Sequence, residues 1–261
     1  MSCSATQGIA VVSALAVVSY FFLTTHDMTN SDMLGALTPK TDVVGESFLY
    51  FEGANGFYAH PAAEEEYPGV VMIHEWWGLN DHIRATAKQL AAEGYRVLAV
   101  DLFGKAATTP DEARAQVSAL NQEVATANLR AATAFLRERG ATKMASLGWC
   151  FGGAQSLKLA LSGEPLDATI IYYGQLVTDP DQLQLVAWPV LGIFGATDQS
   201  IPETMVNAFR DALTSLDIEN SIHIYPGVGH AFANPSGANF APEETKDAWA
   251  KTLVFLNKNL K

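Results

Sequence analysis

The sequence predicts an α/β fold in which helices cover both faces of a mostly parallel central sheet. Three observations lead to this prediction. First, 49% of the 261 residues are hydrophobic and 17% are charged, which is a globular composition. Second, apolar segments of strand length alternate with amphipathic helical segments from Val43 onward. Third, several apolar segments lack polar alternation, as is typical of strands buried on both faces.

Strands are expected wherever a short apolar run is bounded by turn residues. Six runs meet this condition: residues 70–73, 97–100, 144–147, 168–172, 190–194 and 222–225. A hairpin is expected before them, over residues 47–60. Its turn is placed at Asn55-Gly56, because this pair favours the tight turns of hairpins.

Helices are expected in the gaps between these strands and after the last one. The predicted ranges are 81–93, 109–139, 152–161, 202–216 and 242–260. The start of the second helix is the clearest. Thr109 offers an N-cap hydroxyl, Pro110 suits the first helical position, and Glu112 is placed to complete a capping box. In open parallel sheets, ligands bind beyond the carboxyl ends of the strands, so we expect the chemistry there.

The N-terminal segment is interpreted separately. Residues 9–23 form an uncharged apolar run whose length fits a signal-peptide core better than a membrane span. No Lys or Arg precedes Lys40, and no small-residue cleavage site follows the run. An export signal, a short anchor and a mis-assigned start at Met28 or Met33 therefore remain as alternatives. A core helix is disfavoured because the run is apolar on all faces.

Two expectations follow for the organisation of the chain. Residues 1–30 are an apolar N-terminal segment, and residues 31–261 form a single α/β domain. The protein is exported or membrane-anchored if residues 9–23 are a true signal or anchor, and cytoplasmic otherwise.

The composition of the chain indicates which classes of partner the protein can bind. The 16 Lys and Arg residues against 28 Asp and Glu residues give a net charge of −12, which repels phosphate backbones, so no nucleic-acid partner is expected. Membrane contact is expected only if the N-terminal segment is retained. Cys3 and Cys150 are too few for a disulfide framework, and the histidines are scattered, so neither a metal nor a cofactor is expected. The expected partner is a small molecule, and a monomer is expected.

Cys150 is the candidate nucleophile. It lies in Gly148-Trp149-Cys150-Phe151-Gly152-Gly153, between a predicted strand and a predicted helix. This is the context of a nucleophile elbow, in which glycines two positions before and after the nucleophile let the backbones pass closely. A helix N-terminus also favours a thiolate. The competing interpretation is a small buried hydrophobic cysteine.

A cysteine nucleophile needs a base, and the chain order nucleophile, acid, histidine points downstream. Asp198 follows the strand 190–194, and His230 follows the strand that ends at residue 225. Both should therefore reach the same edge of the sheet as Cys150. His223 lies inside a predicted strand and is interpreted as a core-edge residue.

Two further features complete the predicted site. Glu75 follows the strand 70–73 and precedes two tryptophans, so partial desolvation should raise its pKa and suit it to proton transfer. The backbone N–H groups of Trp76 and Phe151 are the candidate oxyanion donors, one after this strand and one after the nucleophile.

Together these residues resemble the dienelactone hydrolase (carboxymethylenebutenolidase) family of α/β-hydrolases, over roughly residues 47–260. The motifs are HEWWGLN at 74–80, GYRVLAVDLFG at 94–104, GWCFGG at 148–153, YYG at 172–174, FGATDQSIP at 194–202 and YPGVGHAF at 225–232. The resemblance implies the α/β-hydrolase fold and a triad of Cys150, Asp198 and His230. It also implies that Glu75 holds the resting thiol and helps to generate the thiolate when substrate arrives.

The sequence departs from the family at two candidate substrate-binding positions. Members that act on dienelactone bind its carboxylate with two arginines, and the matching positions hold Lys105 and Asn234. Lysine keeps the charge without the bidentate fork, and asparagine keeps only hydrogen bonding. An aromatic rim should enclose a small apolar pocket; its members are Trp76, Trp77, Phe103, Trp149 and Phe232.

These inferences predict a hydrolase that cleaves a small activated ester or enol lactone through a Cys-His-Asp triad and an acyl-thioenzyme intermediate. Activated leaving groups are expected because a thiolate is itself a good leaving group, so attack on an ordinary alkyl ester tends to revert. The alternative is a catalytically silent ligand-binding module, since a fold alone does not establish activity.

Overall fold

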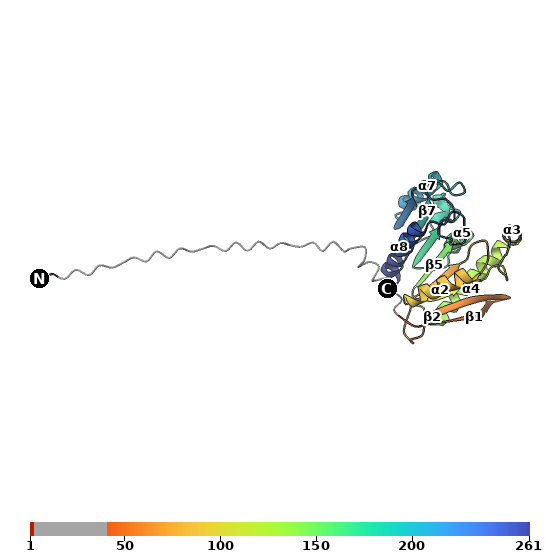
Figure 1. Ribbon diagram of the computed structural model, residues 1–261, viewed down its shortest axis with the longest axis horizontal. Coiled ribbons are helices and arrows are strands. Elements are labelled where there is room, and N and C mark those ends of the chain that lie inside the picture. Colours follow the sequence, from red (N-terminus) through yellow and green to blue (C-terminus); the bar gives the residue numbers. More distant parts are fainter. Residues whose placement is uncertain (3–40) are drawn as a thin grey trace. The chain divides into compact units, whose positions relative to one another are not determined.

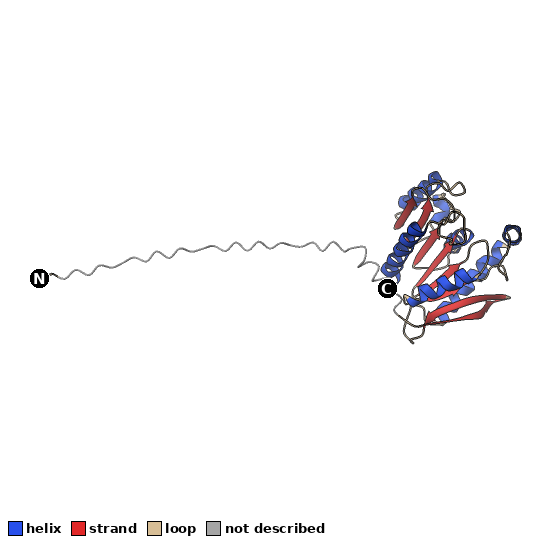
Figure 2. Cartoon of the chain, in the orientation of Figure 1, coloured by secondary structure: helices blue, strands red, loops and turns tan. Residues whose placement is uncertain are grey.

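The computed structural model describes residues 1–2 and 41–261. The prediction made for residues 9–23 lies outside these described residues. Eight strands form a single sheet in the order β1-β2-β4-β3-β5-β6-β7-β8, and helices lie on both of its faces (Figure 1, Figure 2). The predicted α/β fold with a mostly parallel sheet is therefore confirmed.

The strands fall into an antiparallel edge and a parallel body. β1 (Val43–Phe51) pairs with β2 (Ala54–Pro61), and β2 pairs with β4, both antiparallel. The remaining pairings are parallel. The strands involved are β3 (Gly69–Ile73), β4 (Arg96–Ala99), β5 (Met144–Trp149), β6 (Ala168–Tyr172), β7 (Val190–Gly195) and β8 (Asn220–Tyr225). Their carboxyl ends therefore meet at one edge of the sheet.

The lack of alternation in the central strands has the predicted cause. All five residues of β3 are buried, with Val70 and Met72 in the core on one face and Val71 and Ile73 in the core on the other. The first core also contains α2 (Asp81–Ala92) and α8 (Pro242–Leu260). The second contains residues of α4 (Gln122–Glu138), α5 (Phe151–Leu161) and α7 (Glu203–Ser215).

The turn of the leading hairpin is not at Asn55-Gly56. The chain turns at Glu52-Gly53, where Gly53 has a φ of 72°, and Asn55-Gly56 lies within β2. Gly56 serves another purpose: a Cβ there would lie 2.9 Å from the carbonyl oxygen of Ala99 on β4. The glycine thus permits close strand packing.

The helix predicted over residues 109–139 is two helices, α3 (Pro110–Ala119) and α4. Leu120 is extended, with a ψ of 123°, and the Asn121 side chain accepts hydrogen bonds from the N–H groups of Glu123 and Val124. Asparagine is a strong N-cap residue, so it begins a new helix here.

The start of α3 also differs in one detail. Thr109 caps it as predicted, accepting from the Glu112 N–H at 3.3 Å. The Glu112 carboxylate, however, accepts from the N–H of Thr108 at 2.8 Å. The reciprocal bond of the capping box is therefore shifted by one residue.

A short helix that the sequence did not predict, α6 (Pro180–Leu183), is capped by Asp179.

Candidate active site

Cys150 occupies a sharp turn between β5 and α5. Its φ of 52° and ψ of −116° are unusual for a residue with a side chain, and its N–H donates to the Tyr172 carbonyl at 2.9 Å. The flanking glycines are required sterically. A Cβ on Gly148 would lie 2.1 Å from the Gly152 carbonyl oxygen, and a Cβ on Gly152 would lie 2.3 Å from that of Ile73. The turn is thus a nucleophile elbow in its geometry.

Cys150, His230 and Asp198 lie in hydrogen-bonding contact, although they are far apart in the sequence. The Cys150 Sγ is 3.0 Å from His230 Nε2, and His230 Nδ1 is 2.7 Å from Asp198 Oδ2. The other oxygen of Asp198 accepts from the N–H groups of Ser200, at 2.7 Å, and Ile201, at 3.0 Å. These bonds fix the carboxylate and, through it, the imidazole ring.

The electrostatics of the three groups favour a charged imidazole. Burial alone would raise the pKa of Asp198, but the hydrogen bonds from His230, Ile201 and Ser200 outweigh it and lower the pKa. Burial alone would lower the pKa of His230, but its contacts with Asp198 and Cys150 raise that pKa to about 10. The arrangement therefore stabilises a proton on His230 beside the sulfur.

Glu75 is a buried carboxyl with an incomplete set of partners. It is 7% exposed, and its Oε2 accepts a hydrogen bond from the Asn234 amide. Its Oε1 has no hydrogen-bond partner within the described residues. Burial raises the pKa of Glu75 to about 7, against the opposing effects of Asn234, His230 and Tyr173.

The bond expected between Glu75 and the resting thiol is not present among the described residues. The sulfur contacts His230, and the carboxyl contacts Asn234. Because Asn234 holds the carboxyl through a neutral amide, no positive charge lies in hydrogen-bonding contact with Glu75. The side chain of Asn234 is thus committed to Glu75 and is itself only 7% exposed.

A cavity of about 490 Å³ opens above the sulfur. It is lined by Trp76, Arg114, Val117, Ser118, Cys150, Phe151, Ala154, Tyr173, Gln175, Ser200, Ile201 and His230. No Asp or Glu is among these residues, although the chain is strongly acidic. The walls are mostly apolar, which suits a small organic substrate.

The predicted substrate-binding residues lie outside this cavity. Phe232 is fully buried and packs on Tyr225, so it belongs to the core and not to a rim. Trp149 is 7% exposed and lines a different cavity. Trp77 is half-buried against Trp76, and Lys105 is exposed. Of the predicted aromatic rim, Trp76 lines this cavity, and Phe103 lines a different one.

Sequence reasoning missed Arg114 and Tyr173, which do line the cavity. Arg114, Val117 and Ser118 line it from α3, a helix that ends at Ala119 and is separate from α4, and Asn121 is the residue in the sequence that could have indicated this separation. Tyr173 follows β6 with a φ of 35°, and its phenol has no hydrogen-bond partner within the described residues. In the sequence, Tyr173 stands out only as part of the YYG motif at 172–174.

The two candidate oxyanion donors, the N–H groups of Trp76 and Phe151, are available to bind a ligand oxygen. Phe151 is the first residue of α5, so its N–H has no acceptor within the helix. The N–H of Trp76 makes no hydrogen bond to any other described residue. Both residues line the cavity beside Cys150.

A mostly parallel sheet with helices on both faces defines the fold class, and the sharp turn at Cys150 between β5 and α5 has the geometry found in α/β-hydrolases. The model of the dienelactone hydrolase family matches residues 54–260. The chain therefore belongs to the dienelactone hydrolase family, and the prediction of a hydrolase of this family is confirmed.

Two relatives illustrate the similarity in sequence. A protein of Saccharolobus solfataricus, provisionally named a carboxymethylenebutenolidase, is 29% identical over 255 residues, covering 82% of this chain and 98% of the relative. An Escherichia coli K12 protein with the same provisional name is 27% identical over 242 residues, covering 85% of this chain and 89% of the relative.

Solved structures agree with this assignment. A Klebsiella pneumoniae protein, provisionally described as a dienelactone hydrolase, has a TM-score of 0.73 and 27% identity, covering 84% of this chain and all of that one. The acylaminoacyl peptidase of Pyrococcus horikoshii has a TM-score of 0.67 and 18% identity, covering 90% of this chain and 44% of that one. The second likeness shows the fold alone.

Within residues 1–2 and 41–261, no helix has the length and apolar character needed to span a bilayer. The same residues contain no group of three or more His, Cys, Asp or Glu side chains that could hold a metal ion.

Proposed function

We propose that the protein hydrolyses a small activated ester or enol lactone, with Cys150 as nucleophile, His230 as base and Asp198 as the residue that orients it. The observation that carries this proposal is the chain of contacts at 3.0 Å and 2.7 Å from sulfur to imidazole to carboxylate. A base held within hydrogen-bond reach of a nucleophile, and itself oriented by a third group, is the arrangement of nucleophilic catalysis.

The reaction proceeds in two halves. The Cys150 sulfur attacks the carbonyl carbon while its proton rests on His230, and the resulting oxyanion accepts hydrogen bonds from the N–H groups of Trp76 and Phe151. Collapse of the tetrahedral intermediate breaks the carbon–oxygen bond. The leaving oxygen takes the proton from His230, and the acyl group remains on sulfur as a thioester.

Water completes the turnover. His230 accepts a proton from the water, whose oxygen attacks the thioester carbon, and the carbon–sulfur bond breaks to release the acid and restore the thiolate–imidazolium pair. The net change is ester plus water to acid plus alcohol. Burial raises the pKa of Glu75 to about 7, which suits this carboxyl to exchange a proton during turnover.

A mutant series tests the nucleophile. We expect Cys150→Ala to lower kcat/KM on nitrophenyl acetate by on the order of 10³-fold or more, because Cys150 is the one thiol that lines the cavity among the described residues. Cys3→Ala is the matched control and should retain wild-type turnover. Intact-mass spectrometry during turnover should detect an acyl adduct in the wild type and in Cys3→Ala, and none in Cys150→Ala. Wild-type turnover by Cys150→Ala would refute the assignment.

A further inference from the structure

His74 is a fully buried histidine beside the site that the chemistry above does not use. It follows β3 directly, is 0% exposed, and does not line the cavity. Its ring lies 4.9 Å from the ring of Phe103 and is stacked 6.1 Å from that of Phe151. A polar ring in such apolar surroundings is costly unless both of its nitrogens are satisfied.

The two hydrogen bonds of His74 define its protonation state. Nδ1 lies 2.6 Å from the carbonyl oxygen of Glu75, which can only accept. Nε2 lies 3.2 Å from the N–H of Leu102, which can only donate. The ring is therefore neutral, with its proton on Nδ1. Burial lowers the pKa of His74, which is consistent with this state.

The bond from Nδ1 fixes the direction of one peptide group. The Glu75 carbonyl also accepts from the Gly78 N–H at 3.1 Å, so two donors hold it in place. The Glu75–Trp76 peptide is trans, and in a planar trans peptide the N–H points opposite to the C=O. Holding the Glu75 carbonyl toward His74 thus turns the Trp76 N–H away from His74.

The position of this peptide relative to the nucleophile is also fixed. A Cβ on Gly152 would lie 2.5 Å from the carbonyl oxygen of His74, so α5 approaches the end of β3 as closely as a glycine permits. Phe151, which supplies the other candidate oxyanion donor, immediately precedes this glycine and stacks on the His74 ring. The positions of the Trp76 and Phe151 N–H groups therefore both depend on the packing of α5 against the end of β3.

We propose that His74 is a positioning residue, whose Nδ1–H holds the Glu75 carbonyl so that the Trp76 N–H faces the oxyanion formed at Cys150. This inference rests on the proposed acyl transfer at Cys150. Loss of one oxyanion donor lowers kcat by on the order of 10²–10³-fold in other hydrolases, so the effect is measurable.

The test separates oxyanion stabilisation from thiol reactivity. An aldehyde adds to the Cys150 sulfur to form a hemithioacetal, whose oxygen occupies the oxyanion position. Iodoacetamide alkylates the same sulfur by displacing iodide and develops no charge on a carbonyl oxygen at the reacting carbon. We use His74→Phe, which keeps an aromatic ring without hydrogen bonds, and His74→Gln, whose amide can both donate and accept.

We expect His74→Phe to weaken acetaldehyde inhibition and to lower kcat/KM by on the order of 10²-fold, while alkylation by iodoacetamide changes by less than about threefold. His74→Gln should recover a substantial part of both losses. His223→Phe, which makes the same change in β8, should resemble the wild type. If His74→Phe does not fold, His74→Gln alone decides, because it should weaken aldehyde inhibition more than alkylation.

Two results would overturn the inference. One is an equal loss of alkylation and hydrolysis in the His74 variants, which would indicate general disruption of the site. The other is unchanged aldehyde inhibition. Cys150→Ala is assayed in parallel, because turnover by that variant would refute the proposed function itself and not the role of His74 alone.

Discussion

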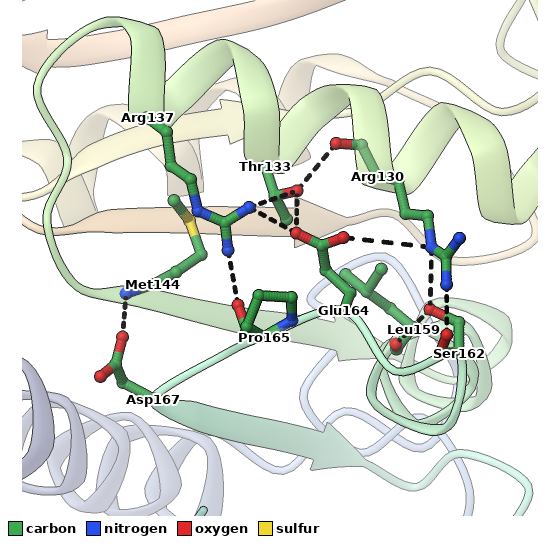
Figure 3. A network of polar contacts seen from close by, with 9 residues as sticks. All are labelled: Arg130, Thr133, Arg137, Met144, Leu159, Ser162, Glu164, Pro165 and Asp167. Carbon is green, nitrogen blue, oxygen red and sulfur yellow. Dashed lines mark hydrogen bonds and ion pairs between the residues drawn. The ribbon is translucent and has the colours of Figure 1, made fainter. Parts of the chain in front are cut away.

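Glu75 and Glu164 are both largely buried, yet their surroundings are opposite in character. Glu164 precedes β6 and has a side chain 12% exposed; Glu75 follows β3 and is 7% exposed. Arg137 donates to Glu164 at 2.5 Å, the Thr133 hydroxyl lies 2.6 Å from the same oxygen, and Arg130 lies 4.0 Å from the other (Figure 3). Glu75 has one neutral donor and one oxygen without a partner among the described residues.

The contrast is between the polar groups at the amino ends of β5 and β6 and those at the carboxyl ends of β3 and β6. At the amino ends of β5 and β6, polar groups are paired: Glu164 and its partners tie α4 to the segment before β6, and Asp167 accepts from the Met144 N–H at 2.7 Å (Figure 3). At the carboxyl ends, Glu75 Oε1 and the Tyr173 phenol lack partners within the described residues. Unpaired buried polar groups cost stability, so proteins retain them where they serve the chemistry.

The largest expected effect is from Asp198→Asn. An amide cannot hold the His230 tautomer as the carboxylate does, so kcat/KM should fall on the order of 10³–10⁴-fold. Asp167→Asn is the matched change at the other end of the sheet and should leave nitrophenyl ester hydrolysis within about twofold of the wild type. Similar losses in the two variants would remove the distinction between the two ends.

Next in size is the pH dependence of Glu75→Gln. The folded pKa of Glu75 is raised from 4.5 to about 7, so its contribution to stability is full below pH 4.5 and is lost as the pH rises through 7. The glutamine variant lacks this loss. Its stability relative to the wild type should therefore rise between pH 5 and pH 8, by at most about 3 kcal/mol.

Urea denaturation at four pH values measures this difference. An offset between the two proteins that stays constant with pH would contradict the raised pKa. The pH profile of kcat/KM is a second test of the raised pKa of Glu75. An inflection near pH 7 in the wild type should be absent in Glu75→Gln.

Glu164→Gln should have a smaller effect, and on stability alone. Its arginine partners are 48% and 38% exposed, so solvent screens the pairs and the cost is about 1 kcal/mol. This corresponds to a fall in Tm of about 2–4 °C for a domain of this size. Turnover should be unchanged, and a loss of activity at constant Tm would contradict the structural role.

The smallest effect is expected for Tyr173→Phe. The Tyr173 hydroxyl is buried without a well-formed hydrogen bond among the described residues, and it acts on Glu75 only by lowering the pKa of that carboxyl. Its removal should therefore change stability by less than about 0.5 kcal/mol. Tyr172→Phe is the control, because its hydroxyl lies 2.6 Å from Thr252 Oγ1 and its loss should cost about 1 kcal/mol. Thermal melts of the two variants compare them directly, and an equal loss would show that the Tyr173 phenol is paired after all.

Much of the fold could be predicted because buried parallel strands leave an unbroken apolar signal. The bounds of β6 and α8 were predicted to the residue. The failures have local causes: Asn55-Gly56 has turn chemistry but is paired within the hairpin with residues of β1, and Asn121 interrupts an otherwise helical pattern. In both places, tertiary packing or a side-chain cap outweighed the periodicity.

For the site, the order of strands along the chain was sufficient to place Cys150, Asp198 and His230 at one edge. The cavity walls could not be predicted in this way. Arg114 lines the cavity from α3, a helix that was expected to be continuous with α4. Asn234 is hydrogen-bonded to Glu75, a contact between residues 159 positions apart. Contacts between residues so far apart cannot be predicted from the spacing of residues along the chain.

The weak attachment of α3 bears on how this enzyme could change over evolutionary time. Ala113 is the one buried residue of α3, yet the helix contributes Arg114, Val117 and Ser118 to the cavity. Those three positions can be varied with little cost to folding, whereas the elbow glycines cannot. Substitutions in α3 can therefore change which substrates fit the cavity, while the residues around Cys150 stay unchanged.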